Sequence, residues 1–422
     1  MPEAVIVSTA RSPIGRAFKG SLKDVRPDDL AARIIAAALA RVPQLDPHLI
    51  DDLMLGCGLP GGESGHNLAR IVAVQLGLDG LPGTTVNRYC SSSLQTTRMA
   101  LHAIRAGEGD VFVSAGVETV SRSVNGTSDG LPGTHNPLFA AAEARTAECA
   151  EVGNKGAARS ASNEGGGGRR AGWDDPREDG LLPDAYIAMG QTAENLAALK
   201  GITRAEQDEF GVRSQNLAEA AIKAGFWQRE ITPVTLPDGT TVSTDDGPRA
   251  GVTLEAVSGL KPVFRPDGTV TAGNCCPLND GAAALVIMSD TKARELGITP
   301  LARVLSTGVS ALSPEIMGYG PVEASKQALR RAGLTIGDID LVEINEAFAA
   351  QVIPSYRDLG IDPDRLNVNG GAIAVGHPFG MTGARITTTL INSLQWHDKQ
   401  LGLETMCVGG GQGMAMVIER LS

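Results

Sequence analysis

Short apolar runs rich in β-branched residues alternate with longer Ala- and Leu-rich stretches along the first part of the chain. The runs at 4–7, 53–55 and 111–114 predict strands, and the stretches at 28–41 and 94–106 predict helices. Strands separated by helices are typical of proteins in which helices cover both faces of a sheet. The pattern therefore predicts an α/β fold.

The second half of the chain repeats this alternation. Its predicted elements are helices at 322–332, 347–356 and 382–394 and strands at 341–344, 406–408 and 414–418. In each half a Val-Asn pair, Val86-Asn87 or Val368-Asn369, precedes a helix and then a strand that ends in glycine. We interpret this correspondence as an internal duplication of a whole domain; two unrelated α/β segments are the alternative.

The region between the halves has a different texture. Residues 123–180 show no sustained periodicity, and 157–172 include a run of four glycines that favours a flexible, solvated insertion. Further on, Thr203 is followed three residues later by Glu206, which predicts a capping box at the start of a helix. We expect a first domain formed by 1–122 and 279–299, an inserted loop domain at 123–278 that covers the substrate, and a second domain at 300–422.

Composition and charge exclude several classes of protein. The 422 residues include 37 Lys+Arg and 48 Asp+Glu, a formal net charge of −11, and no basic stripe, so nucleic acid is not an expected partner. No apolar run approaches the roughly 20 residues of a membrane helix, and the first residues do not resemble a secretion signal. The six cysteines lack metal-type spacing. We expect a cytoplasmic protein with free thiols and no metal site.

Cys90 is the first candidate for chemistry. It precedes Ser91-Ser92-Ser93 at the predicted start of an apolar helix, where unpaired backbone N–H groups and the helix dipole lower a thiol pKa. A cysteine that merely fills a gap in the core is the alternative. The position of Cys90 therefore favours a reactive thiolate, and on this residue alone the structural alternative stays open.

Three further clusters strengthen this interpretation. Asn345 follows an apolar strand, His377 follows a glycine-lined turn, and Cys407 ends a strand before a run of glycines that begins at Gly409. Backbone N–H groups of such glycines can stabilise an oxyanion. Two cysteines, a histidine and an asparagine at loop ends of a duplicated α/β fold indicate acyl transfer through a thioester.

Ordered motifs along nearly the whole chain carry a family resemblance. Among them are Val86-Asn87-Arg88-Tyr89-Cys90-Ser91-Ser92, Ala115-Gly116-Val117-Glu118-Thr119, Met189-Gly190-Gln191-Thr192, Asn279-Asp280-Gly281-Ala282-Ala283, Met317-Gly318-Tyr319-Gly320-Pro321 and the Asn345, His377 and Cys407 clusters. The sequence resembles the thiolases, the family of acetyl-CoA acetyltransferases and 3-ketoacyl-CoA thiolases. The resemblance implies duplicated α/β domains that form a five-layered αβαβα core with an inserted loop domain.

The resemblance also implies a role for each candidate. Cys90 corresponds to the nucleophile that accepts the acyl group, His377 to its base, and Cys407 to a second acid/base that protonates the acetyl-CoA enolate. Asn345 corresponds to a residue that holds a water near that enolate, and the N–H of Gly409 joins that of Cys90 around the tetrahedral intermediate. The implied reaction is cleavage of 3-oxoacyl-CoA by CoA, or the reverse condensation.

Coenzyme A is implied as a substrate, with no metal or redox cofactor. Arg249, Cys276, Met189 and Met317 stand where the resemblance implies contacts with it; a solvated surface charge is the alternative for Arg249. Four residues depart from the family pattern. Cys276 stands in place of serine, and Pro277 and Ser93 each stand where glycine is usual. Ala188 stands where short-chain enzymes commonly carry histidine. Ala188 predicts a wider acyl pocket.

Two alternatives to a thiolase have different chemistry. A β-ketoacyl synthase typically has histidine or asparagine where this chain has Cys407, and a catalytically silent CoA- or lipid-binding relative would not need all four residues. The resemblance further implies a homodimer or homotetramer and is compatible with association with a β-oxidation hydratase/dehydrogenase.

Overall fold

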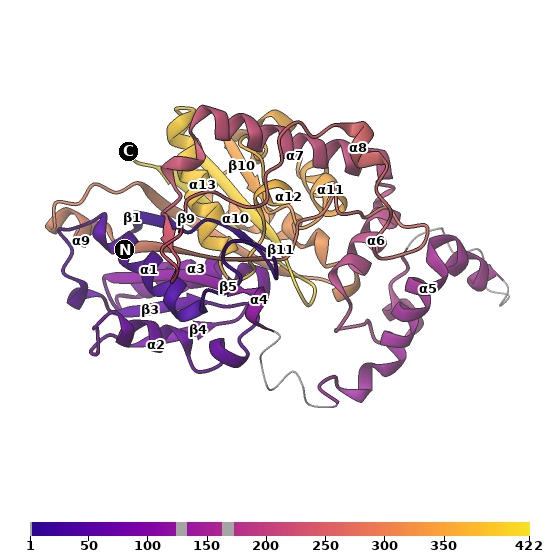
Figure 1. Cartoon of the computed structure of the whole chain (residues 1–422), viewed down its shortest axis with the longest axis horizontal. Coiled ribbons are helices and arrows are strands. Elements are labelled where there is room, and N and C mark those ends of the chain that lie inside the picture. Colours follow the sequence, from indigo (N-terminus) through magenta and orange to yellow (C-terminus); the bar gives the residue numbers. More distant parts are fainter. Residues whose placement is uncertain (1, 124–132, 163–172) are drawn as a thin grey trace.

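The computed structural model describes residues 2–123, 133–162 and 173–422 (Figure 1). Within these residues ten strands form one hydrogen-bonded sheet, in the order β10-β11-β12-β9-β1-β8-β5-β3-β4, with β2 paired to β8. The strands are β1 (Ala4–Arg11), β2 (Gly15–Arg16), β3 (Asp52–Gly56), β4 (Gly83–Val86), β5 (Val111–Thr119), β8 (Asn279–Ser289), β9 (Ala302–Ala311), β10 (Leu341–Ile344), β11 (Leu401–Val408) and β12 (Gln412–Arg420). A separate hairpin joins β6 (Val234–Thr235) to β7 (Thr241–Val242).

The sheet consists of two halves with the same topology. In the N-terminal half β4, β3 and β5 are parallel, and β8 and β1 follow antiparallel. In the C-terminal half β10 and β11 are parallel, and β12 and β9 follow antiparallel. A parallel bridge from Val342 to Leu366 stands in the position of β4. The strands of the two halves are joined where Val5 and Ile6 of β1 pair with β9. The predicted duplication is confirmed.

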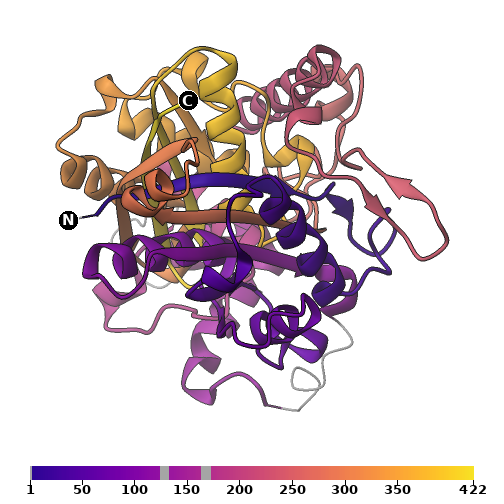
Figure 2. The same cartoon turned by 90° about the vertical axis from the view of Figure 1, so that its left-hand side faces the viewer.

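Helices divide the molecule into five layers. In the N-terminal half α1 (Pro27–Ala40) and α2 (Leu68–Gln75) cover the outer face; in the C-terminal half α10 (Gly320–Ala332) and α11 (Ala349–Leu359) do so. Between the halves, α3 (Ser92–Ala106) packs against α13 (Thr382–Trp396). Three buried apolar clusters fill the space between the layers. Figure 2 shows the N-terminal half below the C-terminal one. The predicted αβαβα core is confirmed.

A long insertion separates β5 from β8. Its helices are α4 (Val120–Ser123), α5 (Ala140–Ser162), α6 (Met189–Lys200), α7 (Arg204–Ala224) and α8 (Leu254–Ser258), while α9 (Asp290–Glu295) follows β8 and α12 (Ala372–Val375) lies before α13. The predicted capping box of Thr203 and Glu206 begins α7. Helix α5 was not predicted; it extends to Ser162, whereas residues 163–172 of the expected flexible run lie outside the described residues. Helices α6 and α7 pack on α11.

Candidate active site

Cys90 lies in a short 3₁₀ helix, Tyr89–Ser91, that leads directly into α3. This turn packs against the end of β11 and the start of α13, so the thiol of the N-terminal half faces loops of the C-terminal half. Tyr89 adopts a positive φ of 43°, a conformation that costs free energy outside glycine and that tertiary contacts must maintain. Cys90 itself is 7% exposed. The central layer therefore encloses the candidate nucleophile.

Burial dominates the electrostatics of Cys90. Desolvation raises the pKa of its thiol to about 12, while hydrogen bonds from the backbone N–H groups of Gly409 and of Cys90 itself act in the opposite direction. The prediction that the helix N-terminus leaves a lowered pKa and a thiolate is therefore wrong, because removal from water outweighs the dipole. The two N–H groups that reach the sulfur are the pair expected around a tetrahedral oxyanion.

Three thiols gather at this point. Cys407, the second-last residue of β11, is fully buried, and desolvation followed by the charge of Cys90 raises its pKa. The pKa of Cys276 is raised by burial and then by Cys275, Cys90 and Cys407. Because Cys90 and Cys407 both affect its pKa, Cys276, which is expected to contact coenzyme A, lies close to both candidate catalytic cysteines. All six cysteines are free thiols.

His377 follows a glycine with a φ of 111°, Gly376, in the loop before α13. Burial, and secondarily Arg385, lowers the pKa of the imidazole to about 3. The Thr382 hydroxyl donates to the carbonyl of Pro378 at 2.7 Å, so at its 2.6 Å contact with His377 Nδ1 we assign it as acceptor. The ring is therefore neutral with its proton on Nδ1, and the unprotonated Nε2 is the nitrogen that can accept a proton.

Asn345 follows the last residue of β10 and lies beside His377. Its Nδ2 is 3.4 Å from Nδ1 and 3.3 Å from Nε2 of the imidazole. Its Oδ1 is buried and has no hydrogen-bond partner among the described residues, so it can accept a bond from water or substrate. The next residue, Glu346, accepts bonds from Ser214, Asn367 and the backbone of Ile373, which fixes the loop that carries His377.

A buried carboxylate connects the two halves at the site. Glu118, near the end of β5, accepts N–H bonds from Gly58 (2.8 Å), Leu59 (3.1 Å) and Gly380 (2.8 Å). Desolvation nevertheless raises its pKa to about 7. Glu118 was not predicted as a site residue, although a charged residue near the end of an otherwise apolar strand was a signal in the sequence.

Ser93 provides a second connection. Its Oγ accepts the N–H of Ala384, in the first turn of α13, at 2.9 Å. A Cβ at Gly383 would lie 2.2 Å from the backbone nitrogen of Leu94, so only glycine allows the two helices to approach this closely. Ser93, one of the departures from the family pattern, thus holds the nucleophile helix against the histidine loop.

The expected coenzyme A contacts lie on two sides of the cysteines. Met317 is buried, and Met189 and Cys276 pack against the same apolar cluster that contains Cys407. Arg249 is exposed, and its backbone N–H is bound by Gln215 of α7. A Cβ at Gly247 would lie 2.2 Å from the carbonyl oxygen of Ala374, so the Arg249 segment runs against the histidine loop.

Residues 2–123, 133–162 and 173–422 contain no group of three or more His, Cys, Asp or Glu side chains arranged to hold a metal ion. Over the same residues, no helix combines the length and apolarity required to cross a bilayer.

Comparisons with known proteins agree with this architecture. Residues 4–291 match the family description "Thiolase, N-terminal domain" and residues 298–420 match "Thiolase, C-terminal domain". An acetyl-CoA acetyltransferase of Cupriavidus necator is 43% identical and a 3-ketoacyl-CoA thiolase of Aeromonas salmonicida 42% identical, each over 100% of both chains. The crystal structure of the Bacillus anthracis acetyl-CoA acetyltransferase superimposes with a TM-score of 0.83 and 38% identity, covering 100% of this chain and 99% of that one. The chain belongs to the thiolase family.

Proposed function

We propose that this protein is an acyl-CoA C-acyltransferase that cleaves 3-oxoacyl-CoA with CoA, or runs the reverse condensation, through an acyl-Cys90 intermediate. The observation that carries the proposal is the meeting of Cys90 with the N–H of Gly409 and with Cys407, since a nucleophile, an oxyanion donor and a second acid then share one enclosed space. Full-length relatives with acyltransferase names support the same activity.

The first half-reaction transfers the acyl group to the enzyme. Cys90 and His377 are both neutral at rest, so His377 Nε2 takes the thiol proton as Sγ attacks the 3-oxo carbon. The N–H groups of Cys90 and Gly409 stabilise the oxyanion, and the bond between C2 and C3 then breaks. Cys407 gives its proton to C2 of the departing enolate, whose oxygen lies near His377 and a water held by Asn345.

The second half-reaction restores the enzyme. The Cys407 thiolate takes the proton of the CoA thiol, and the CoA sulfur attacks acyl-Cys90. The Cys90 sulfur leaves and recovers its proton from His377. Cys90, His377 and Cys407 are then in their starting protonation states. The reaction has consumed one 3-oxoacyl-CoA and one CoA.

A direct test is to trap the intermediate. Incubation with acetyl-CoA should add one acetyl group to the tryptic peptide that contains Cys90, and Cys90→Ser should abolish thiolysis of 3-oxoacyl-CoA. Cys149→Ala is the matched control, because Cys149 lies on α5 of the insertion and no other cysteine contributes to the shift of its pKa; it should leave thiolysis unchanged. Thiolysis by Cys90→Ser at the parent rate would disprove the proposal.

We further propose that the acyl pocket accepts chains longer or more branched than acetoacetyl-CoA. Ala188 immediately precedes α6, next to Met189, and its methyl group fills less space than the histidine common in short-chain enzymes. Across a panel of 3-oxoacyl-CoA substrates, kcat/KM should rise with chain length, and Ala188→His should reverse this preference. Leu199→His, at an exposed position of the same helix, should not. A parent enzyme that strongly prefers acetoacetyl-CoA would contradict the proposal.

Arg249, Cys276, Met189 and Met317 are proposed to bind coenzyme A. The exposed Arg249 beside the histidine loop supports a contact with the anionic nucleotide end, and the apolar surroundings of Met317 and Cys276 support a contact with pantetheine. Arg249→Ala should raise KM for CoA while leaving acylation of Cys90 at saturating acyl-CoA unchanged. An unchanged KM would return Arg249 to the role of a solvated charge.

A further inference from the structure

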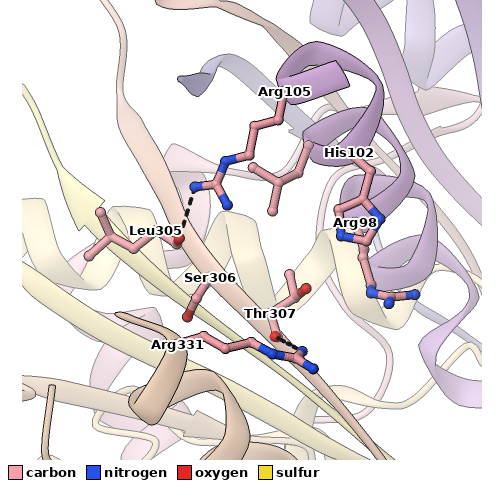
Figure 3. A pocket seen from close by; sticks show the side chains of 8 residues that line it. Arg98, His102, Arg105, Leu305, Ser306, Thr307 and Arg331 are labelled. Atoms are coloured by element: carbon pink, nitrogen blue, oxygen red, sulfur yellow. Dashed lines mark hydrogen bonds between the residues drawn. The ribbon is translucent and has the colours of Figure 1, made fainter. Parts of the chain in front are cut away.

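A pocket of about 300 Å³ opens where α3, β9 and α10 meet (Figure 3). Helix α3 forms one wall, β9 the floor and α10 the opposite rim. The lining residues are Arg98, Leu101, His102, Arg105, Leu305, Ser306, Thr307 and Arg331. None of them takes part in the proposed acyl transfer.

The charged groups of this pocket all carry or can accept positive charge. Its lining holds three arginines and one histidine but no carboxylate among the described residues. The pKa of Arg98 is lowered by burial and then by the charges of Arg88 and Arg331, and that of His102 by burial and then by three arginines. In a chain with a net charge of −11, such an uncompensated cluster makes a local positive potential.

Hydrogen bonds within the protein use little of the donor capacity of these arginines. Strand β1 pairs with β9 only at Ala302 and Arg303, which leaves the next carbonyls of β9 without a strand partner on that side. Arg105 donates to the carbonyl of Leu305 at 3.0 Å and Arg331 to that of Thr307 at 2.6 Å (Figure 3). Because a guanidinium has five N–H donors, most donors of Arg105 and Arg331 have no protein acceptor in the part of the chain that the structure describes.

Arg98 is the least satisfied of the three. Its Nε is buried and has no partner among the described residues, and its closest polar contact is Gln95 Oε1 at 3.5 Å. A buried N–H without a partner destabilises the fold, and a bound anion would supply the missing acceptor. An anion there would also offset the repulsion between Arg98 and Arg88, whose guanidinium binds Gln412 next to the glycine turn of the site.

We propose that this pocket binds the phosphate group of a small anionic ligand. Guanidinium groups bind phosphate oxygens in pairs, and arginines from two helices surround an anion from two sides. A phosphate, with three or more acceptor oxygens, can use these donors more fully than a carboxylate with two. The pocket is thus a second anion site, separate from the proposed nucleotide contact at Arg249.

Pyrophosphate and inorganic phosphate are suitable probes. Calorimetry at low salt should detect one saturable pyrophosphate site per chain, and pyrophosphate should raise Tm. Arg331→Gln and Arg98→Gln should each weaken binding by about tenfold per lost charge-assisted hydrogen bond and remove the shift in Tm. Arg330→Gln is the matched control, because Arg330 is adjacent on α10, exposed and outside the pocket lining.

Three outcomes would overturn the proposal. Arg331→Gln could lower the basal Tm yet keep the pyrophosphate-induced shift, which would make the arginine only a cap for β9. Saturating CoA could displace pyrophosphate from parent and variants alike, which would assign binding to the coenzyme A site. The parent could fail to bind either probe while both arginine variants change the mass measured by light scattering, which would show that the pocket meets carboxylates of a second copy.

Discussion

The two halves of the molecule share one topology but hold different chemistry at equivalent positions. In the N-terminal half α3 follows β4, and in the C-terminal half α13 follows the bridge at Leu366 that takes the place of β4. Cys90 precedes α3, and His377 precedes α13. The second-last residue of the strand in the middle of each half is Glu118 in β5 and Cys407 in β11. The proposed nucleophile therefore comes from one copy, and both proposed proton-transfer groups come from the other.

This difference shows how a duplicated scaffold can form one site. Each copy supplies the same geometric elements, a helix start and a strand end, and the central layer brings them together because α3 packs on α13. Different side chains at only a few equivalent positions then give the two copies different proposed roles in the reaction. Variants at residues of each half and of the insertion should therefore differ in their effects on acylation, turnover and stability.

The strongest test separates the acid/base groups of the C-terminal half. His377→Ala should slow acylation of Cys90 by on the order of 10²–10⁴-fold, because the thiol, with a pKa raised to about 12, cannot lose its proton unaided. Cys407→Ala should lower turnover by a similar factor while acetyl-CoA still acylates Cys90. Quenched-flow mass spectrometry measures both. Equal acylation rates in the two variants would contradict the division of roles.

Glu118 should make stability depend on pH. Its pKa rises from an ordinary 4.5 to about 7, so its contribution of about 3 kcal/mol is fully present below pH 4.5 and is lost as pH rises through about 7. Glu118→Gln should remove this loss, as measured by urea unfolding across that range. Glu108→Gln, an exposed carboxylate, should retain it. If the free energy of unfolding changes with pH equally in the parent and in Glu118→Gln, the carboxyl group of Glu118 does not titrate in this pH range.

Ser93 tests the contact between the central helices. Ser93→Ala leaves the N–H of Ala384 without its acceptor, which should cost about 1–2 kcal/mol and lower kcat by disturbing the loop of His377. Thr97→Ala is the control, because Thr97 bonds only to Ser93 and Ser114 within the N-terminal half. It should lower stability alone. A kcat loss in both variants would mean that the contact between halves has no special effect.

The smallest effect is expected outside both halves. Thr203→Ala removes the capping box of α7, which should cost about 1 kcal/mol in thermal unfolding and leave the acylation rate unchanged. Thr203→Ser should restore the stability. A change in acylation would imply that the insertion influences the geometry of the site.

Local patterns predicted much of the fold. The strand Leu341–Ile344 was predicted with its observed bounds, because a short apolar run ends at a polar cluster. Strand β8 was missed, since its Ala-rich start does not resemble a strand; β1 and β5 on either side make it one. The sign of the Cys90 pKa shift was predicted wrongly, because desolvation depends on which residues the folded chain packs around the thiol. The bonds from Gly380 to Glu118 and from Ala384 to Ser93 join residues more than 250 positions apart, so local patterns could not predict them.

The position of β8 also affects how the chain folds during synthesis. This strand lies between β1 and β5, yet residues 120–278 must leave the ribosome before it can enter the sheet. Until then β1 and β5 have exposed edges. These edges delay completion of the sheet and can pair with strands of other chains. The half that carries Cys90 is therefore completed only shortly before synthesis of the half that carries His377 and Cys407 begins, and the two copies become able to fold almost together.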